Sequence, residues 1–142
     1  MHYAILLTLI SSWYLVGLGV TVALNVYPSF DFVKDDKWET FHIHHSNRIS
    51  WAVGVAWLTQ AAGLALWLFA GPHATLVMWI LCALCALGAV ALTVFSAVPI
   101  HKNLTRHFDS ALQSKLRSVH LMRTISWVLG ALFATVALLR VL

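Results

Sequence analysis

Four long apolar runs limit what this chain can fold into. They lie near residues 4–26, 50–70, 75–98 and 119–140, and only 10% of the 142 residues are charged. A helix of about 20 residues crosses a hydrocarbon core of roughly 30 Å, and a soluble helical domain would need polar outer faces that these runs lack. The sequence therefore predicts a single all-α domain over residues 1–142, a transmembrane four-helix bundle.

Lysine and arginine in the connections between the spans predict the orientation. All but Arg140 lie in or beside the first and third connections. Because cytoplasmic loops are enriched in these residues, we expect that edge to be cytoplasmic, in a bacterial inner membrane, with both termini outside. The formal net charge of +4 indicates contact with anionic lipid. No basic and aromatic pattern indicates nucleic acid as a partner.

The connections carry signals of their own. Pro28 should end the first span, because proline disfavours helix in the preceding residue. Asp36 and Glu39 have the spacing of a capping box, so we expect the second helix to begin near residue 37. Apolar and polar residues recur at helical spacing over residues 100–117, which predicts an amphipathic interfacial helix between spans three and four.

Six of the eight histidines lie at the charged edge, at positions 42, 44, 45, 101, 107 and 120. Polar groups that a membrane protein gathers at one depth are a functional-site hypothesis. Helix faces sort them, since small and weakly polar residues mark the sides of membrane helices that pack together. His44 and His107 are expected at the surface. The residues expected to point into the bundle are His42, His45, His101 and His120.

The same reasoning predicts the inward face of the first span. Ser11, Tyr14, Thr21 and Asn25 recur there at helical spacing, so we expect all four to face the other helices.

Four inward histidines from three segments suggest a metal site. Neutral imidazole is the commonest side-chain metal ligand, and a redox role favours iron or copper over zinc. Two further interpretations stay open. In the first, the histidines bind a substrate or transfer protons without a metal. In the second, they have a structural role and only contact headgroups and water. Paired histidines on facing helices would also suit a b-type haem.

Arg48 and Arg123 lie about one turn below the charged edge. A buried arginine needs a partner, and its planar fork suits a carboxylate, phenolate or enolate. Both are candidate catalytic residues that would hold an anionic oxygen of the substrate, although either would also reach the lipid headgroups. Trp127, one turn beyond Arg123, is a candidate wall of a pocket for an aromatic substrate.

Residues 98–127 carry a recurring pattern. Residues 98–104 read Val-Pro-Ile-His-Lys-Asn-Leu, residues 120–124 read His-Leu-Met-Arg-Thr, and Trp127 follows. This resembles the P-x-N/H-x-x-L and N/H-x-x-R-T-x-x-W signature of the anthrone-oxygenase-like family of small four-span membrane proteins. The resemblance implies an oxygenase or related oxidoreductase with His101, His120 and Arg123 at its site. Asparagine is common in that family where this chain has the two histidines, which favours a metal site here and a substrate other than anthrone.

The expected function is a membrane-embedded oxidoreductase, a metal-dependent oxygenase whose site lies at the cytoplasmic end of the bundle. Its substrate would be a hydrophobic small molecule, for example a phenol, that enters from the bilayer. A b-type haem electron carrier and a non-enzymatic metal-handling accessory subunit are the alternatives. With so little soluble chain, a homo-oligomer or a partner in a membrane complex is also expected.

Overall fold

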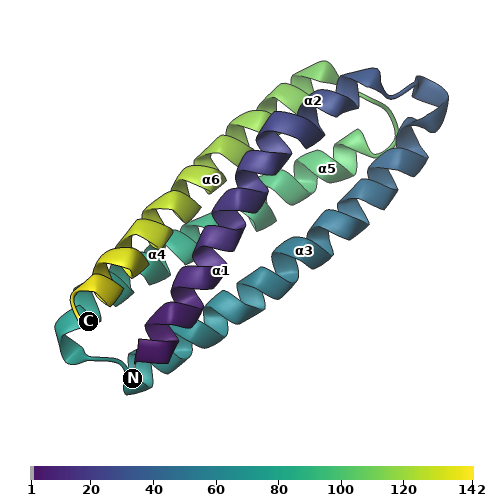
Figure 1. Cartoon of the computed structure of the whole chain (residues 1–142). Coiled ribbons are helices and arrows are strands. Elements are labelled where there is room, and N and C mark those ends of the chain that lie inside the picture. Colours follow the sequence, from purple (N-terminus) through teal and green to yellow (C-terminus); the bar gives the residue numbers. More distant parts are fainter. Residues whose placement is uncertain (1) are drawn as a thin grey trace.

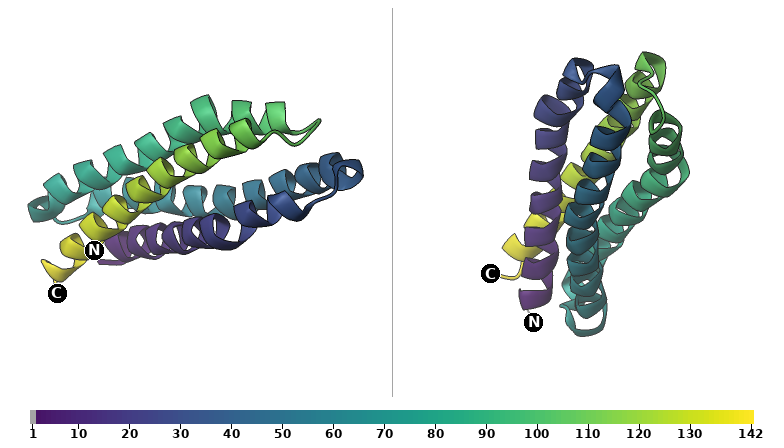
Figure 2. Two further views of the ribbon diagram at one scale, coloured as in Figure 1. Left: turned by 90° about the horizontal axis from the view of Figure 1, so that it is seen from above. Right: turned by 90° about the vertical axis from the view of Figure 1, so that its right-hand side faces the viewer.

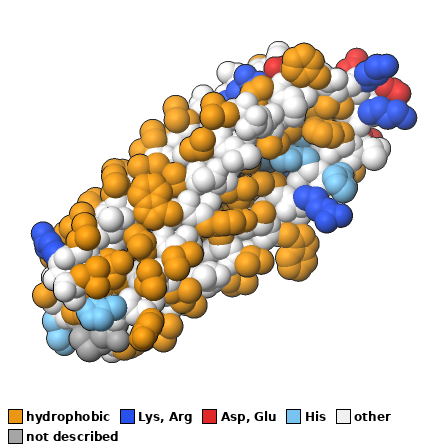
Figure 3. Space-filling view, in the orientation of Figure 1, with side chains coloured by type: hydrophobic (Ala, Val, Ile, Leu, Met, Phe, Trp, Pro, Cys, Tyr) orange, Lys and Arg blue, Asp and Glu red, His pale blue; other side chains and the backbone are white. Residues whose placement is uncertain are grey.

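The computed structural model describes residues 2–142, which form four long helical segments lying side by side as a bundle (Figure 1). Residues 2–32, 35–70, 73–104 and 110–139 are each long and apolar enough to cross a membrane. The predicted all-α, four-helix architecture is confirmed. Hydrophobic side chains cover the middle of the molecule, and charged side chains gather mainly at the end opposite the two termini (Figures 1 and 3).

The first segment stays helical beyond its proline. It consists of α1 (His2–Thr21), a π-helical turn η1 (Val22–Val26), α2 (Tyr27–Ser29) and a 3₁₀ turn η2 (Phe30–Phe32). The prediction that Pro28 ends this span is wrong, since the helix runs on to Phe32. The wide turn before the proline relieves the clash between its ring and the carbonyl four residues back.

The third segment repeats this arrangement. A 3₁₀ turn η3 (His73–Thr75) leads into α4 (Leu76–Leu92), a second π-helical turn η4 (Thr93–Ala97) and α5 (Val98–Leu104), with Pro99 in the first turn of α5. Each proline therefore follows a π turn by two residues, and neither breaks its helix.

The second segment is the single helix α3 (Asp35–Ala70). Its N-cap is Lys34, and no side chain caps it, so the predicted capping box of Asp36 and Glu39 is wrong and the helix begins two residues early. Asp35 and Asp36 instead stand in the first turn, where their charges favour the positive end of the helix.

A separate interfacial helix over residues 100–117 does not form, so that prediction is wrong. Residues 98–104 prolong the third segment as α5, and residues 110–117 are the first turns of α6 (Ser110–Leu139). The chain breaks between them because Asp109 caps α6: its Oδ1 accepts a hydrogen bond from the Leu112 amide at 2.8 Å.

The helices do not pack equally. α1 packs closely against α3 and α6, and α4 packs closely against α6, whereas α3 and α4 touch only loosely. Both views in Figure 2 show α3 and α4 leaving their short connection together and diverging along the bundle. One side of the bundle is therefore less tightly closed than the others, at the end where the histidines lie.

Two glycines allow the closest approaches. At Gly19 of α1 a Cβ atom would lie 2.8 Å from Thr124 Oγ1 and 3.2 Å from the Trp127 ring, so α1 meets α6 there. At Gly63 of α3 a Cβ atom would lie 2.6 Å from Thr8 Oγ1. Small residues at membrane helix contacts allow such backbone approach.

Candidate functional site

Arg123 is the most unusual buried group at the histidine-rich end. Its side chain on α6 is only 8% exposed, and it lies over the Trp127 ring with 5.0 Å between the guanidinium carbon and the ring centroid. One terminal nitrogen donates to Thr93 Oγ1 at 3.1 Å and the other to His120 Nδ1 at 2.9 Å. Trp127 thus supports the guanidinium and does not line the cavity described below, contrary to the role expected for it.

This cation lacks a counter-charge. Neither of the two ion pairs found among residues 2–142 includes Arg123, and within that range its Nε is buried without a hydrogen-bond partner. A charge withdrawn from water without compensation is costly. A free N–H on a buried cation is therefore the strongest indication of a ligand-binding role in this protein.

His120 positions this arginine. Its Nε2 lies 2.8 Å from the Gly19 carbonyl oxygen, which only accepts, so Nε2 carries the proton and Nδ1 accepts from Arg123. The Tyr27 ring packs edge-on against the imidazole at 5.0 Å between centroids. Both ring nitrogens of His120 are thus engaged, and neither is available to a metal ion in this arrangement.

His42 and His101 form a second unit. His42 Nε2 on α3 lies 3.2 Å from His101 Nδ1 on α5, and His42 Nδ1 lies 3.4 Å from Thr105 Oγ1. The Thr105 hydroxyl donates to the His101 carbonyl, so it accepts the proton of His42 Nδ1. His42 Nε2 must then accept from His101 Nδ1, which leaves a lone pair on His101 Nε2.

His45 completes the group without a close contact. It is half-buried, its ring centroid lies 5.2 Å from that of Phe30 and 6.3 Å from that of His101, and the described residues give it no hydrogen-bond partner. Across residues 2–142, no three His, Cys, Asp or Glu side chains stand in a metal-binding arrangement. The four predicted ligands thus divide into a contacting pair, a neighbour and the separately engaged His120.

A cavity of about 230 Å³ lies between α3 on one side and η4 and α5 on the other, beside these groups. It brings together Arg123, His101 and His45 of the predicted site residues. His42 and His120 lie behind its wall, and Arg48 is exposed and does not line it. His44 and His107 are exposed, as expected. Other residues that line the cavity include Tyr27, Ile49, Val53, Trp57, Thr93 and Val94.

The two π turns stand on either side of Arg123. Thr93, which binds the guanidinium, is the first residue of η4, and Gly19, which binds His120, lies one turn before η1. π turns are rare and occur frequently at functional sites. Their position here adds to the case that this is one.

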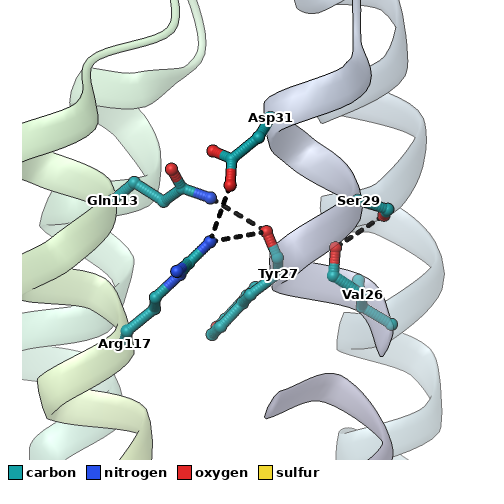
Figure 4. A network of polar contacts seen from close by, with 6 residues as sticks. All are labelled: Val26, Tyr27, Ser29, Asp31, Gln113 and Arg117. Atoms are coloured by element: carbon teal, nitrogen blue, oxygen red, sulfur yellow. Dashed lines mark hydrogen bonds and ion pairs between the residues drawn. The ribbon is translucent and has the colours of Figure 1, made fainter. Parts of the chain in front are cut away.

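A polar network outside the cavity fixes Tyr27 (Figure 4). The Tyr27 carbonyl accepts from Gln113 Nε2 at 2.9 Å and from Arg117 at 3.2 Å, and Arg117 also pairs with Asp31 at 3.2 Å. These contacts tie the end of the first segment to α6. The Tyr27 side chain is thereby held between His120 and the cavity.

Tyr27, Thr93 and Trp57 were not expected at the site. One sequence signal points to the region: Ile-Ser-Trp-x-x-Gly occurs at residues 49–54 and again at 125–130, each time shortly after His-x-x-Arg. The two halves of the chain thus share this motif, and the first helical segment of each also contains a π turn and a proline. Only the second copy buries its arginine and tryptophan.

The site therefore combines a buried cation with a free N–H, an imidazole lone pair and an apolar cavity between two loosely packed helices. Such a set can bind an oxygen that becomes negatively charged and accept the proton that it loses. Comparisons with protein-family models, with curated proteins and with solved structures find no match to this chain.

Proposed function

We propose that this protein is a membrane oxidoreductase, an oxygenase that acts on a hydrophobic molecule with an ionisable oxygen. The observation that carries the proposal is the cavity lined by both Arg123 and His101, where a cation without an ion-pair partner among residues 2–142 shares one space with an imidazole. The anthrone-oxygenase-like pattern of residues 98–127 supports the same reaction class.

The residues support a reaction that begins with proton transfer. His101 Nε2 accepts a proton from the substrate, and Arg123 stabilises the oxygen that gains negative charge. The resulting enolate or phenolate is electron-rich and reacts with O₂. When an activated CH₂ group becomes C=O, one oxygen atom enters the product and the other leaves as water, so no outside reductant is needed.

Oxygen uptake by the purified protein in lipid nanodiscs tests this proposal. With a hydrophobic phenol that carries an activated CH₂ group, we expect uptake that falls at least about a hundredfold in Arg123→Gln, since one oxyanion donor contributes about that much. His101→Gln should lose activity similarly. Arg106→Gln and His107→Gln remove exposed groups of the same types at the same edge and are the matched controls. Equal loss in controls and site variants would refute the assignment.

A metal site is the second candidate, and the His42–His101 distance favours it. Two nitrogens that bind one ion at about 2.0–2.1 Å each lie roughly 2.8–3.4 Å apart for angles near 90–110° at the metal. The observed 3.2 Å falls within that range. His45 is the nearest third histidine but would have to move. Because the described residues do not complete a metal-binding group, no step of the reaction is assigned to a metal.

Metal analysis with an optical spectrum separates these candidates. Iron or copper bound in a fixed ratio, and lost in a His42→Ala, His101→Ala double variant but retained in His44→Ala, would establish the metal site. Haem would give a strong Soret band. The 3.2 Å separation is shorter than the roughly 4 Å between trans axial nitrogens, so we expect no such band.

We also propose that the histidine-rich end is cytoplasmic, on the distribution of lysine and arginine. Both termini lie at the opposite end of the bundle (Figure 1). Reporter fusions after residue 142 and within the first connection test the orientation. A cytoplasmic signal from the C-terminal fusion would reverse it.

A further inference from the structure

The size of the cavity limits what it holds. At about 230 Å³ it is smaller than the roughly 300–1,000 Å³ typical of sites for drug-sized ligands. A cavity of about 150 Å³ accepts benzene. The space therefore suits one substituted ring. The rings of Tyr27 and Trp57 are part of its lining and suit an aromatic guest.

The binding groups distinguish between kinds of acidic oxygen. One terminal nitrogen of Arg123 donates to Thr93 and the other to His120, and each keeps a second N–H for a ligand. A hydroxyl can accept such an N–H and donate its own proton to the lone pair of His101. An ionised carboxylate has no proton to donate, so that its oxygens would face the lone pair of His101 unpaired.

The cavity also has a side opening. Its wall includes Ser50 and Gly54 on α3 and Val94 and Val98 across the gap, and the two valines are 48% and 41% exposed. No atom lies within 4 Å of the position of a Cβ at Gly54. The gap thus reaches the outer surface of the bundle at a depth where the surrounding side chains are apolar, and a chain attached to a bound ring has a path into lipid.

Building on the proposed function, we propose that the substrate is a phenolic lipid. Its ring enters the cavity sideways between α3 and the η4–α5 stretch, its hydroxyl binds the Arg123 guanidinium and His101 Nε2, and its alkyl or isoprenoid chain stays in the bilayer. The volume of the cavity suits one ring better than several fused rings, and the lone pair of His101 selects against an ionised fatty acid, which has no proton to donate to it.

Binding to the full-length protein in nanodiscs tests this, with ligand concentrations expressed per lipid. The probes are 4-decylphenol, phenol, decylbenzene and decanoate. We expect 4-decylphenol to bind at least about tenfold more tightly than decylbenzene or decanoate, since hydrogen bonds to charged groups contribute about that much. Arg123→Gln should remove the preference for the hydroxyl. Decylbenzene or decanoate binding as tightly as 4-decylphenol would overturn the proposal.

A second variant tests the sideways entry without touching a charged group. Gly54→Leu places a side chain in the opening, and Gly17→Leu places one in open space on α1. Gly54→Leu should weaken 4-decylphenol about tenfold and phenol much less, whereas Gly17→Leu should change neither. Equal effects of Gly54→Leu on both probes would refute the path. Tight binding without O₂ uptake would support this ligand class and refute the oxygenase, so the two failures are distinguishable.

Discussion

Gly19→Ala should separate α1 from α6 at the point where the site is assembled. The new Cβ would lie 2.8 Å from Thr124 Oγ1 and 3.2 Å from both Thr124 Cγ2 and the Trp127 ring. Neither neighbour can yield easily, because threonine branches at Cβ and Trp127 is 2% exposed. Overpacking of this kind costs about 1–3 kcal/mol. Weakening the His120 bond to the Gly19 carbonyl adds about 0.6 kcal/mol, the average for hydrogen bonds within membranes.

The gain in helix propensity offsets at most about 1 kcal/mol of this, so the free energy of unfolding should fall by about 1–3 kcal/mol in Gly19→Ala. Gly17→Ala is the matched control two residues away, since its Cβ meets no atom within 4 Å. Helix propensity should stabilise that variant by at most about 1 kcal/mol. Reversible unfolding by SDS from mixed micelles, followed by circular dichroism, measures both. Equal stability of the two variants would show that α1 and α6 do not meet as described.

Two other contacts give predictions of the same type. Gly63→Ala should lower the free energy of unfolding by about 1–3 kcal/mol, because a Cβ there would lie 2.6 Å from Thr8 Oγ1 and 2.8 Å from the Thr8 amide nitrogen. Gly54→Ala is the control, since a Cβ there has open space. Equal SDS midpoints of the two variants would contradict the close α1–α3 contact. Asp109→Ala should cost about 1 kcal/mol by removing the cap of α6. Hydrogen exchange at the Leu112 amide should then accelerate, and unchanged exchange would exclude the cap.

The apolar runs and the helix faces were sufficient to predict much of this molecule. Four runs of membrane-spanning length predicted four helices, and the small-residue faces correctly directed His42, His120 and Arg123 inward. The exposure of His44 and His107 was predicted by the same reasoning. These results depend only on regular helical geometry, which α3 and α6 follow throughout.

The first span shows why the rest could not be predicted. Tyr14 is 51% exposed, and Thr21 and Asn25 are also exposed, although all three were expected to face inward. α1 is packed against two neighbours, so small residues lie on more than one side of it, and Thr8 and Ser12 are the buried ones. Asn25 also lies inside a π turn, where α-helical spacing no longer applies.

The pairing of His42 with His101 depends on how the third connection folds. Ring-to-ring contact at 3.2 Å requires α5 to continue the third segment up to Leu104. The amphipathic spacing of residues 100–117 suggested instead a helix lying along the membrane surface. Spacing alone does not reveal a break of five residues between two helices that each continue the pattern, so the position of His101 followed only from the structure.

The two π turns also determine the direction about the helix axis in which the side chains after them point. Residues eight apart in an α-helix point about 80° away from each other, whereas a π turn between them absorbs one residue and reduces the difference to about 20°. Gly19 and Tyr27 are one such pair, and Thr93 and His101 are the other. Each pair spans a π turn, which places both of its members on the side that meets His120 or Arg123. The one extra residue in each π turn thus aligns the groups of the site. Deleting a residue from either π turn would rotate the later member of that pair, Tyr27 or His101, away from the site.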